Sequence, residues 1–207
     1  MGLLDGDIRL VLLDVGGVLI HLRPWAEVLE PLGIRSAAEV RQALEPLEAS
    51  ETARRFQRGE VRPEEFIADV RHALSIDWSD RAIRERYLQR LGPPMERMED
   101  LIRELRARGL RVAALSNTCP IHVDALRRYP FAALIERLIA SCEIGRAKPS
   151  RAAYEEAVHI LEVEPEQALL IDDLSENIQG AREAGLGAVL FEGPANLRQA
   201  LGLPPSA

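Results

Sequence analysis

The sequence predicts an α/β fold, a doubly wound parallel sheet with a small all-helical domain inserted after its first strand. Two observations lead to this prediction. Short, almost wholly apolar runs alternate with amphipathic helical segments, whereas residues 20–92 carry a helical pattern alone. Parallel strands are covered on both faces by crossover helices, so their sequences are apolar throughout instead of alternating.

The first apolar run is IRLVLLDV at residues 8–15, which ends in an acid and is followed by two glycines. Four later runs have the same character: VAALS at 112–116, LIAS at 138–141, ALLIDD at 168–173 and GAVLF at 187–191. Amphipathic segments at 95–109 and 150–162 lie between them and stop at Gly109 or before Pro165. Strands joined by such helices form right-handed crossovers, so we expect a parallel sheet.

The segment 20–92 contains no run that resembles a strand. Its amphipathic stretches predict about four helices, which are separated by Pro24, Gly33, Gly59, Pro63 and the Gly92-Pro93-Pro94 stretch. We therefore expect a core domain formed by residues 1–19 and 93–207, and a helical cap formed by residues 20–92. Phe56, Phe66 and Tyr87 are expected in the core of this cap.

Composition and charge narrow the function classes. A formal net charge of −7 argues against a general nucleic-acid binder, which needs a basic surface. No apolar run approaches the roughly 18 residues of a membrane span, and no basic-then-apolar leader precedes residue 8. A cytoplasmic protein without membrane partners is the expectation. Cys119 and Cys142 lack metal-binding or redox spacing and are expected to be reduced thiols.

Polar residues gather where the predicted strands end. They are Asp14, Gly16 and Gly17 after the first strand, Ser116 and Asn117 after the second, Lys148 after the third, and Asp172, Asp173 and Asn177 after the fourth. Because the carboxyl ends of parallel strands lie at one edge of a sheet, these groups should converge on one pocket.

The residue types in this pocket indicate phosphoryl transfer, in which positioning and charge neutralisation do most of the catalysis. The adjacent carboxylates of Asp172 and Asp173 repel each other without a cation and are hard ligands suited to Mg²⁺. The Ser116 hydroxyl and the Lys148 ammonium can hold phosphate oxygens. Asp14, on its glycine-flanked turn, is then the carboxylate best placed to form an aspartyl-phosphate.

The segments DVGGVL, LSNT, GRAKP and IDDLSENIQGAREAG resemble, in this order, the four motifs of the haloacid dehalogenase superfamily. The resemblance spans nearly the whole chain. It implies a Rossmann-like core with a C1-type helical cap. The segment FQRGEVRPEEF is also similar to the cap of the phosphatase branch that contains glucose-1-phosphatase-like proteins and the N-terminal domain of soluble epoxide hydrolases. A Mg²⁺-dependent phosphatase acting on a small phosphorylated metabolite is therefore implied.

The resemblance also implies roles for individual residues. Asp14 would be the nucleophile and, with the Gly16 carbonyl and Asp173, a metal ligand. Asp172 would act through water or by orienting the metal. The phosphoryl group would be contacted by Ser116 and Lys148, by Gly16 and Gly17, and by Asn117 through its backbone, while Asn177 would be a weaker or water-mediated metal ligand. Apart from the resemblance, His21 and Arg23 at the start of the insert are candidates for a replacement acid or a substrate clamp, and Trp25 is a candidate for the lining of the substrate pocket.

One position departs from the family pattern. Phosphatases of this family usually have a second aspartate two residues after the nucleophile, where this chain has Gly16. The glycine keeps a carbonyl for the metal but removes a general acid, which is typically worth about 10²–10⁴-fold. An active enzyme would then favour leaving groups that need little protonation, such as anomeric sugar phosphates or acyl phosphates, or use a cap residue or water instead. The alternative is a catalytically weak or inactive protein that binds or senses phosphometabolites.

Three other functions fit less well. Receiver domains place their acidic pair before the phosphorylated aspartate, whereas here Asp172 and Asp173 come last. A haloacid dehalogenase would have no use for that pair. A sugar-phosphate mutase depends on a general acid at position 16, where this chain has Gly16. The sequence does not indicate an oligomeric state.

Overall fold

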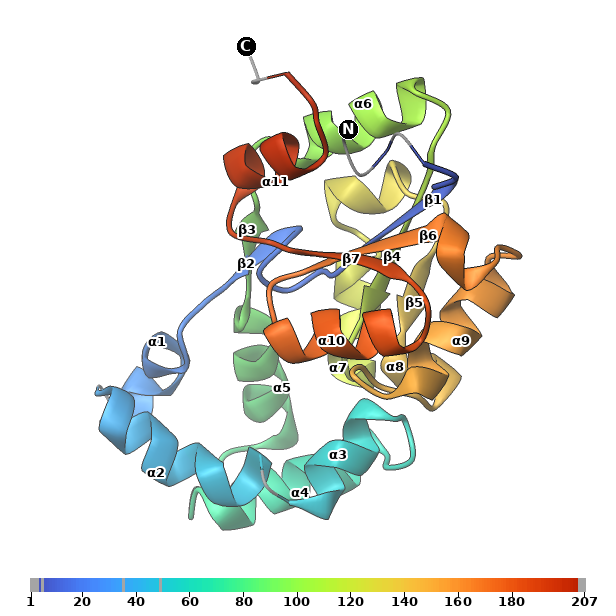
Figure 1. The fold of residues 1–207 in the computed structure, drawn as a ribbon. Coiled ribbons are helices and arrows are strands. Elements are labelled where there is room, and N and C mark those ends of the chain that lie inside the picture. Colours follow the sequence, from blue (N-terminus) through green and yellow to red (C-terminus); the bar gives the residue numbers. More distant parts are fainter. Residues whose placement is uncertain (1–3, 5, 35, 49, 205–207) are drawn as a thin grey trace.

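The computed structural model describes residue 4 and residues 6–34, 36–48 and 50–204. Its centre is a five-stranded parallel sheet in the order β5-β4-β1-β6-β7 (Figure 1). The strands are β1 (Leu10–Leu13), β4 (Arg111–Ser116), β5 (Leu138–Ala140), β6 (Ala168–Asp172) and β7 (Gly187–Leu190). All five coincide with the apolar runs of the sequence, so the predicted α/β fold is confirmed.

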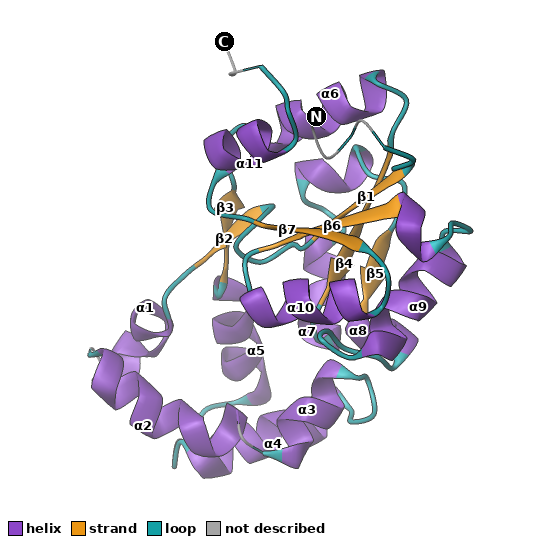
Figure 2. Cartoon of the chain, viewed as in Figure 1, coloured by secondary structure: helices purple, strands orange, loops and turns teal. Residues whose placement is uncertain are grey.

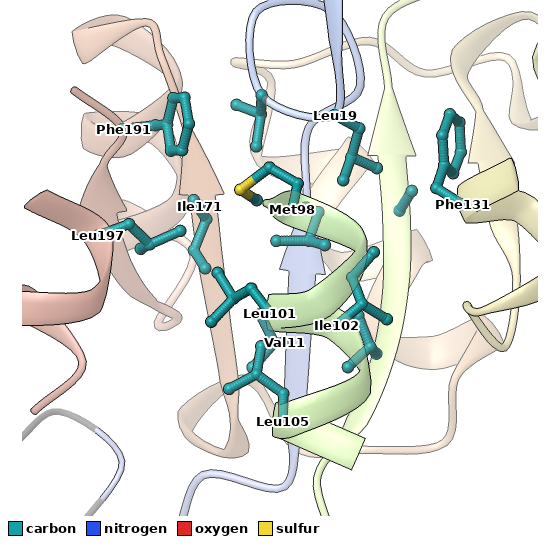
Figure 3. Close-up of a cluster of buried hydrophobic side chains, with 14 of the residues drawn as sticks. Val11, Leu19, Met98, Leu101, Ile102, Leu105, Phe131, Ile171, Phe191 and Leu197 are labelled. Carbon is teal, nitrogen blue, oxygen red and sulfur yellow. The ribbon is translucent and has the colours of Figure 1, made fainter. Parts of the chain in front are cut away.

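Helices cover both faces of this sheet, and each face has its own apolar cluster. On one face, α6 (Met98–Ala107) places Met98, Leu101, Ile102 and Leu105 on the β-strands, as Figure 3 shows. This i, i+3, i+4, i+7 spacing puts all four side chains on one side of a helix. The other helices of the core are α7 (Pro120–Leu126) and α11 (Pro194–Ala200) on that face, α9 (Arg151–Ile160) and α10 (Ser175–Glu183) on the opposite face, and the short α8 (Ser141–Ile144), η2 (Pro130–Ala133) and η3 (Pro165–Gln167).

A second region, here called the helical lobe, lies beside the core (Figure 2). Within the described residues it consists of α1 (Trp25–Leu29), η1 (Glu30–Leu32), α2 (Ala37–Glu48), α3 (Glu51–Gln57), α4 (Pro63–Ala73) and α5 (Asp80–Gln89). Ser50 and Ser79 cap α3 and α5 by accepting the amide protons of Ala53 and Ala82. The lobe has an apolar cluster of its own. Within the described part of the chain, no helix combines the length and apolar character needed to cross a membrane.

The chain enters and leaves the lobe through a two-stranded antiparallel ribbon of β2 (Ile20–Leu22) and β3 (Leu91–Pro94). The helical interpretation of residues 20–92 contained no strand, so here the structure differs. These strands are three and four residues long, too short to show an alternating pattern, and they pair across the whole lobe. Their pairing is set by tertiary contact and not by local propensity.

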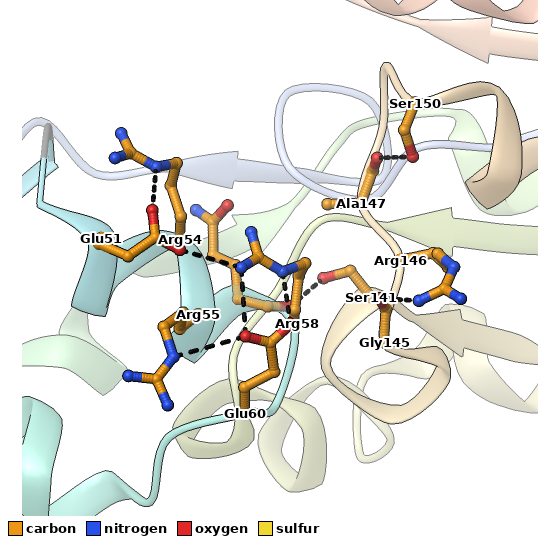
Figure 4. Close-up of polar contacts among 11 residues, drawn as sticks. Glu51, Arg54, Arg55, Arg58, Glu60, Ser141, Gly145, Arg146, Ala147 and Ser150 are labelled. Carbon is orange, nitrogen blue, oxygen red and sulfur yellow. Dashed lines mark hydrogen bonds and ion pairs between the residues drawn. The ribbon is translucent and has the colours of Figure 1, made fainter.

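The lobe is docked against the strand ends of the core. The Ser141 hydroxyl donates to the Gln57 carbonyl at 2.7 Å, and Figure 4 shows Ser141 facing the end of α3 beside Arg58. Gly59 lies so close to Cys142 that a Cβ would come within 2.0 Å of the Cys142 carbonyl oxygen. On the other side, His122 of α7 is hydrogen-bonded to the Tyr87 carbonyl of α5 at 2.8 Å.

Candidate active site

The strand ends bring Asp14, Ser116, Lys148 and Asp172 together beneath the helical lobe. Asp14 directly follows β1, and its amide donates to the Ile171 carbonyl of β6 at 2.9 Å. Ser116 and Asp172 are the last residues of β4 and β6. All four are buried, with exposures of 8%, 4%, 4% and 0% in the order named. The convergence expected from the sequence is therefore what the structure has, although the loop residue Lys148 alone gives no local sign of burial.

Lys148 links the two buried aspartates. Its Nζ lies 2.7 Å from Asp14 Oδ1 and 2.5 Å from Asp172 Oδ2. Burial alone would lower the pKa of Lys148, but the two carboxylates outweigh it and raise the pKa. Burial raises the pKa of Asp14 to about 6, against the opposing pull of the Lys148 ammonium. One ammonium between two carboxylates leaves an excess negative charge in a site of low dielectric.

Asp173 adds a third carboxylate to this group. Carboxylate oxygens of Asp14, Asp172 and Asp173 lie within 4.8 Å of one another. Burial, with the neighbouring Asp172 charge, raises the pKa of Asp173. Three carboxylates with one ammonium make a hard, oxygen-rich donor set of the kind that binds Mg²⁺. The residues present therefore fit a divalent cation.

The loop after β1 lets Asp173 approach. The Gly17 amide donates to the Ile20 carbonyl at 2.9 Å, which closes a tight loop. Gly17 has a φ of +85°, and a Cβ at this position would lie 2.1 Å from Asp173 Oδ2. Only glycine fits both the backbone conformation and the close approach.

Asp172 is held on both carboxylate oxygens. Oδ2 accepts from Lys148, while Oδ1 accepts from the Leu174 amide and from Asn177 Nδ2, each at 2.9 Å. The Tyr154 hydroxyl fixes Asn177 through its backbone carbonyl at 2.8 Å. Asn177 Oδ1 is buried and has no hydrogen-bond partner among the described residues. A buried acceptor of this kind calls for a donor or a cation.

Two positioning contacts were not expected from the sequence. The Asn117 side chain donates to the Lys148 carbonyl at 2.7 Å and accepts from the Lys148 amide at 2.8 Å. It thus fixes the loop that carries Lys148, whereas the sequence suggested only a backbone role. Ser141 accepts from the Thr118 amide at 2.9 Å. Its position at the end of a predicted strand was the only signal that could have found it.

A cavity of about 380 Å³ lies between the strand ends and the helical lobe. Gly16, Ser116 and Asn117 line its core end, and Trp25 lines its lobe side. Its other walls are formed by Val15, Ile20, Leu22, Leu44, Leu47, Ala53, Arg54, Phe56, Gln57, Phe66, Tyr87, Arg90, Leu91, Thr118, Cys119, His122 and Leu126. Of the three additional candidates, Trp25 thus faces the cavity, whereas His21 and Arg23 are exposed and lie outside its described lining.

A family model and several known proteins match this chain. A family model described as haloacid dehalogenase-like hydrolase matches residues 8–185. A sesquiterpene phosphatase, astK, from Aspergillus oryzae is 26% identical over 179 residues, which cover 86% of this chain and 87% of that protein. Protein CbbY from Cereibacter sphaeroides is 28% identical over 201 residues, 90% of this chain and 85% of that protein.

Solved structures share the architecture. A HAD family enzyme from Bacteroides thetaiotaomicron, in complex with magnesium and inorganic phosphate, superposes with a TM-score of 0.75 at 24% identity, covering 90% of this chain and 95% of that one. An L-2-haloacid dehalogenase from Xanthobacter autotrophicus gives a TM-score of 0.68 at 20% identity, covering 89% and 77%. At these identities the likeness concerns the fold, which both a phosphate-binding and a dehalogenating protein adopt.

Proposed function

Because the chain belongs to the haloacid dehalogenase-like hydrolase family, as its four motifs indicate, we propose that it is a Mg²⁺-dependent phosphatase with Asp14 as its nucleophile. The substrate is a small phosphorylated compound. The observation that carries the proposal is the buried Asp14-Lys148-Asp172 triad with Asp173 beside it. Relatives named as phosphatases support the same reaction class.

The metal site in this proposal uses oxygen ligands only. Asp14, Asp173 and the Gly16 carbonyl would hold Mg²⁺, with Asp172 and Asn177 orienting the ligands from the second layer. A bound Mg²⁺ would offset the repulsion between the incoming phosphate and the carboxylates. Burial raises the pKa of both Asp14 and Asp173, and the Asp172 charge adds to the effect in each case, which fits a site completed by a cation.

The residues then act in two steps. An Asp14 carboxylate oxygen forms a bond to phosphorus while the bond from phosphorus to the leaving oxygen breaks, which gives an aspartyl-phosphate. Water hydrolyses this intermediate, releasing inorganic phosphate and restoring the carboxylate. Lys148 and Ser116 stabilise charge on the phosphoryl oxygens, and Asn117 keeps Lys148 in place.

The helical lobe acts as a cap in this proposal. Residues 20–92, with the β2-β3 ribbon at their ends, cover the strand ends and exclude bulk water from them. Docking through Ser141 and His122 holds the lobe over the cavity. A water-poor site strengthens the electrostatic contacts on which the reaction depends.

The absent acid at Gly16 supports a second candidate, a weak or inactive phosphate-binding protein. The two can be separated by measuring Mg²⁺-dependent phosphate release from acetyl, aryl, glycosyl and simple alkyl phosphates. The phosphatase proposal expects turnover of the substrates with good leaving groups, and none by Asp14→Asn. If no ester or anhydride is turned over while beryllium fluoride still binds with Mg²⁺, the protein is a phosphate-binding relative and not an enzyme.

A further inference from the structure

Granted the proposed phosphatase activity, on which this inference rests, we infer that the leaving group is apolar and aromatic. The substrates are then aryl phosphate monoesters and not sugar phosphates. The mainly apolar, aromatic walls of the cavity lead to this class, and the lack of a carboxylic acid among its described lining residues favours phenols over simple alcohols as leaving groups.

The lobe side of the cavity is an aromatic wall made by Trp25, Phe56, Phe66 and Tyr87. The rings of Phe56 and Phe66 stack with centroids 4.1 Å apart. Phe66 meets Tyr87 edge-on at 5.3 Å, and Tyr87 meets Trp25 in the same manner at 5.5 Å. These contacts fix the rings relative to one another, so the wall is formed before a ligand enters. Flat apolar groups are the ligands that such walls favour.

Sugar hydroxyls would lack the carboxylate acceptors that commonly bind them. The described residues that line the cavity include no aspartate or glutamate. Both polar groups of the Asn117 side chain are already bonded to the backbone of Lys148. Arg54, with a side chain that is 54% exposed, is bonded to Glu51 at the rim. A sugar would exchange its hydration for a lining that is mainly apolar, which is unfavourable.

Among the described residues of the cavity lining there is no carboxylic acid to protonate a leaving group, and its histidine is held by the backbone. His122 Nε2 donates to the Tyr87 carbonyl at 2.8 Å, because a carbonyl can only accept. Burial lowers the pKa of His122 and raises the pKa of Cys119 to about 11. A leaving oxygen that needs little protonation is therefore favoured. A phenol has a pKa of about 10, as tyrosine does, whereas simple alcohols lie near water at about 15.7.

The test compares 2-naphthyl phosphate, glucose 1-phosphate and acetyl phosphate with Mg²⁺. Acetyl phosphate has a good leaving group but no ring, so it reports the chemistry without the cavity. We expect kcat/KM for 2-naphthyl phosphate to exceed that for glucose 1-phosphate by at least about tenfold. Equal values, or a preference for the sugar, would overturn the inference while leaving the phosphatase proposal intact.

A variant that fills the cavity isolates the role of its walls. Ala53 lines the cavity, whereas Ala68 on α4 is exposed. Ala53→Phe should reduce kcat/KM for 2-naphthyl phosphate by at least about tenfold and change that for acetyl phosphate by less than about twofold. Ala68→Phe should change neither. Equal losses on both substrates in Ala53→Phe would contradict the assignment.

A binding measurement keeps the inference testable without turnover. Titration calorimetry with 2-naphthylmethylphosphonate and Mg²⁺ should detect binding that Ala53→Phe weakens by at least about tenfold and Ala68→Phe does not. If no phosphate ester or anhydride is hydrolysed but this pattern holds, the phosphatase proposal fails and the ligand class stands. If the phosphonate binds both variants equally, the ligand class fails.

Discussion

The strand-end site and the cavity under the helical lobe differ in almost every physical respect. Around Asp14, Lys148 and Asp172 the buried groups are charged and linked by short hydrogen bonds. The lobe side of the cavity is instead mostly aromatic and aliphatic, and Trp25, Phe56 and Phe66 are among its lining residues. In the proposed function the core therefore carries out the reaction, whereas the lobe selects the molecule that reaches it. Changes in the two regions should accordingly have separable effects.

The largest effect is expected from removing the proposed nucleophile, Asp14. Asp14→Asn keeps the shape of the side chain but cannot form the aspartyl-phosphate, so kcat should fall at least about 10⁴-fold. Phosphate release from acetyl phosphate with Mg²⁺ measures this. Circular dichroism should show an unchanged fold, because Lys148 keeps Asp172 as its charged partner. Residual activity within about tenfold of the parent protein would exclude Asp14 as nucleophile.

Lys148→Met should come next, and it should affect stability as well as rate. The variant leaves Asp14 and Asp172 facing each other without their ammonium. Removing one partner of a buried ion pair typically costs about 3–5 kcal/mol, and loss of one charge-stabilising donor lowers kcat by about 10²–10³-fold. Thermal unfolding without metal and phosphate release measure the two effects.

The matched control for this variant is Arg151→Met. Arg151 pairs with Glu155 at 2.7 Å on the surface, and both side chains are mostly exposed. Surface pairs contribute little because water and salt screen them, so the melting temperature should hardly change. Mg²⁺ should restore part of the stability lost in Lys148→Met and none in the control. Equal melting temperatures for the two variants would mean that the buried triad does not stabilise the fold.

The difference between the core and the helical lobe also explains how much of the structure could be predicted from the sequence. The five sheet strands were predictable because a strand buried on both faces must be apolar along its length, as in residues 8–15. The meeting of Asp14 and Asp172 was predictable because the carboxyl ends of parallel strands lie at one edge of a sheet. Burial of Lys148 could not be seen locally, since GRAKPS has the composition of an ordinary loop.

The lobe was less predictable. β2 and β3 are short and pair across the whole insertion, so no local pattern marks them. Phe56 and Phe66 were expected in the cap core, and they do lie in its apolar cluster. That they also line a cavity depends on how the lobe docks on the core. Helical periodicity distinguishes an apolar face from a polar one, but not a packed face from one that faces an open space.

A gain of function should follow from restoring the acid. A Cβ on Gly16 would meet the Leu22 side chain at 2.9 Å, and Leu22 is 41% exposed and free to move. Gly16→Asp should therefore be tolerated. It should raise kcat/KM for simple alkyl phosphates by about 10²-fold, at the lower end of the range for general acids, and for aryl phosphates far less.

Gly16→Asn is the control for this substitution, since it adds the same bulk without a proton to donate. It should leave the ratio of alkyl to aryl rates unchanged. A rise in that ratio in both variants would trace the effect to shape and not to acid catalysis. A pH profile supports the distinction, because only the aspartate variant should acquire an additional ionisation.

The smallest effect is expected at the residue that joins the two regions. Ser141 accepts from the Thr118 amide and donates to the Gln57 carbonyl of the lobe. Ser141→Ala leaves a buried amide without a partner, which typically costs about 1–3 kcal/mol and should loosen the lobe over the cavity. KM for 2-naphthyl phosphate should rise severalfold, while kcat for acetyl phosphate should hardly change, because Asp14 and Lys148 do not contact Ser141. A matched loss in kcat on both substrates would mean that docking of the lobe controls the chemistry itself, and the separation between the two regions would then fail.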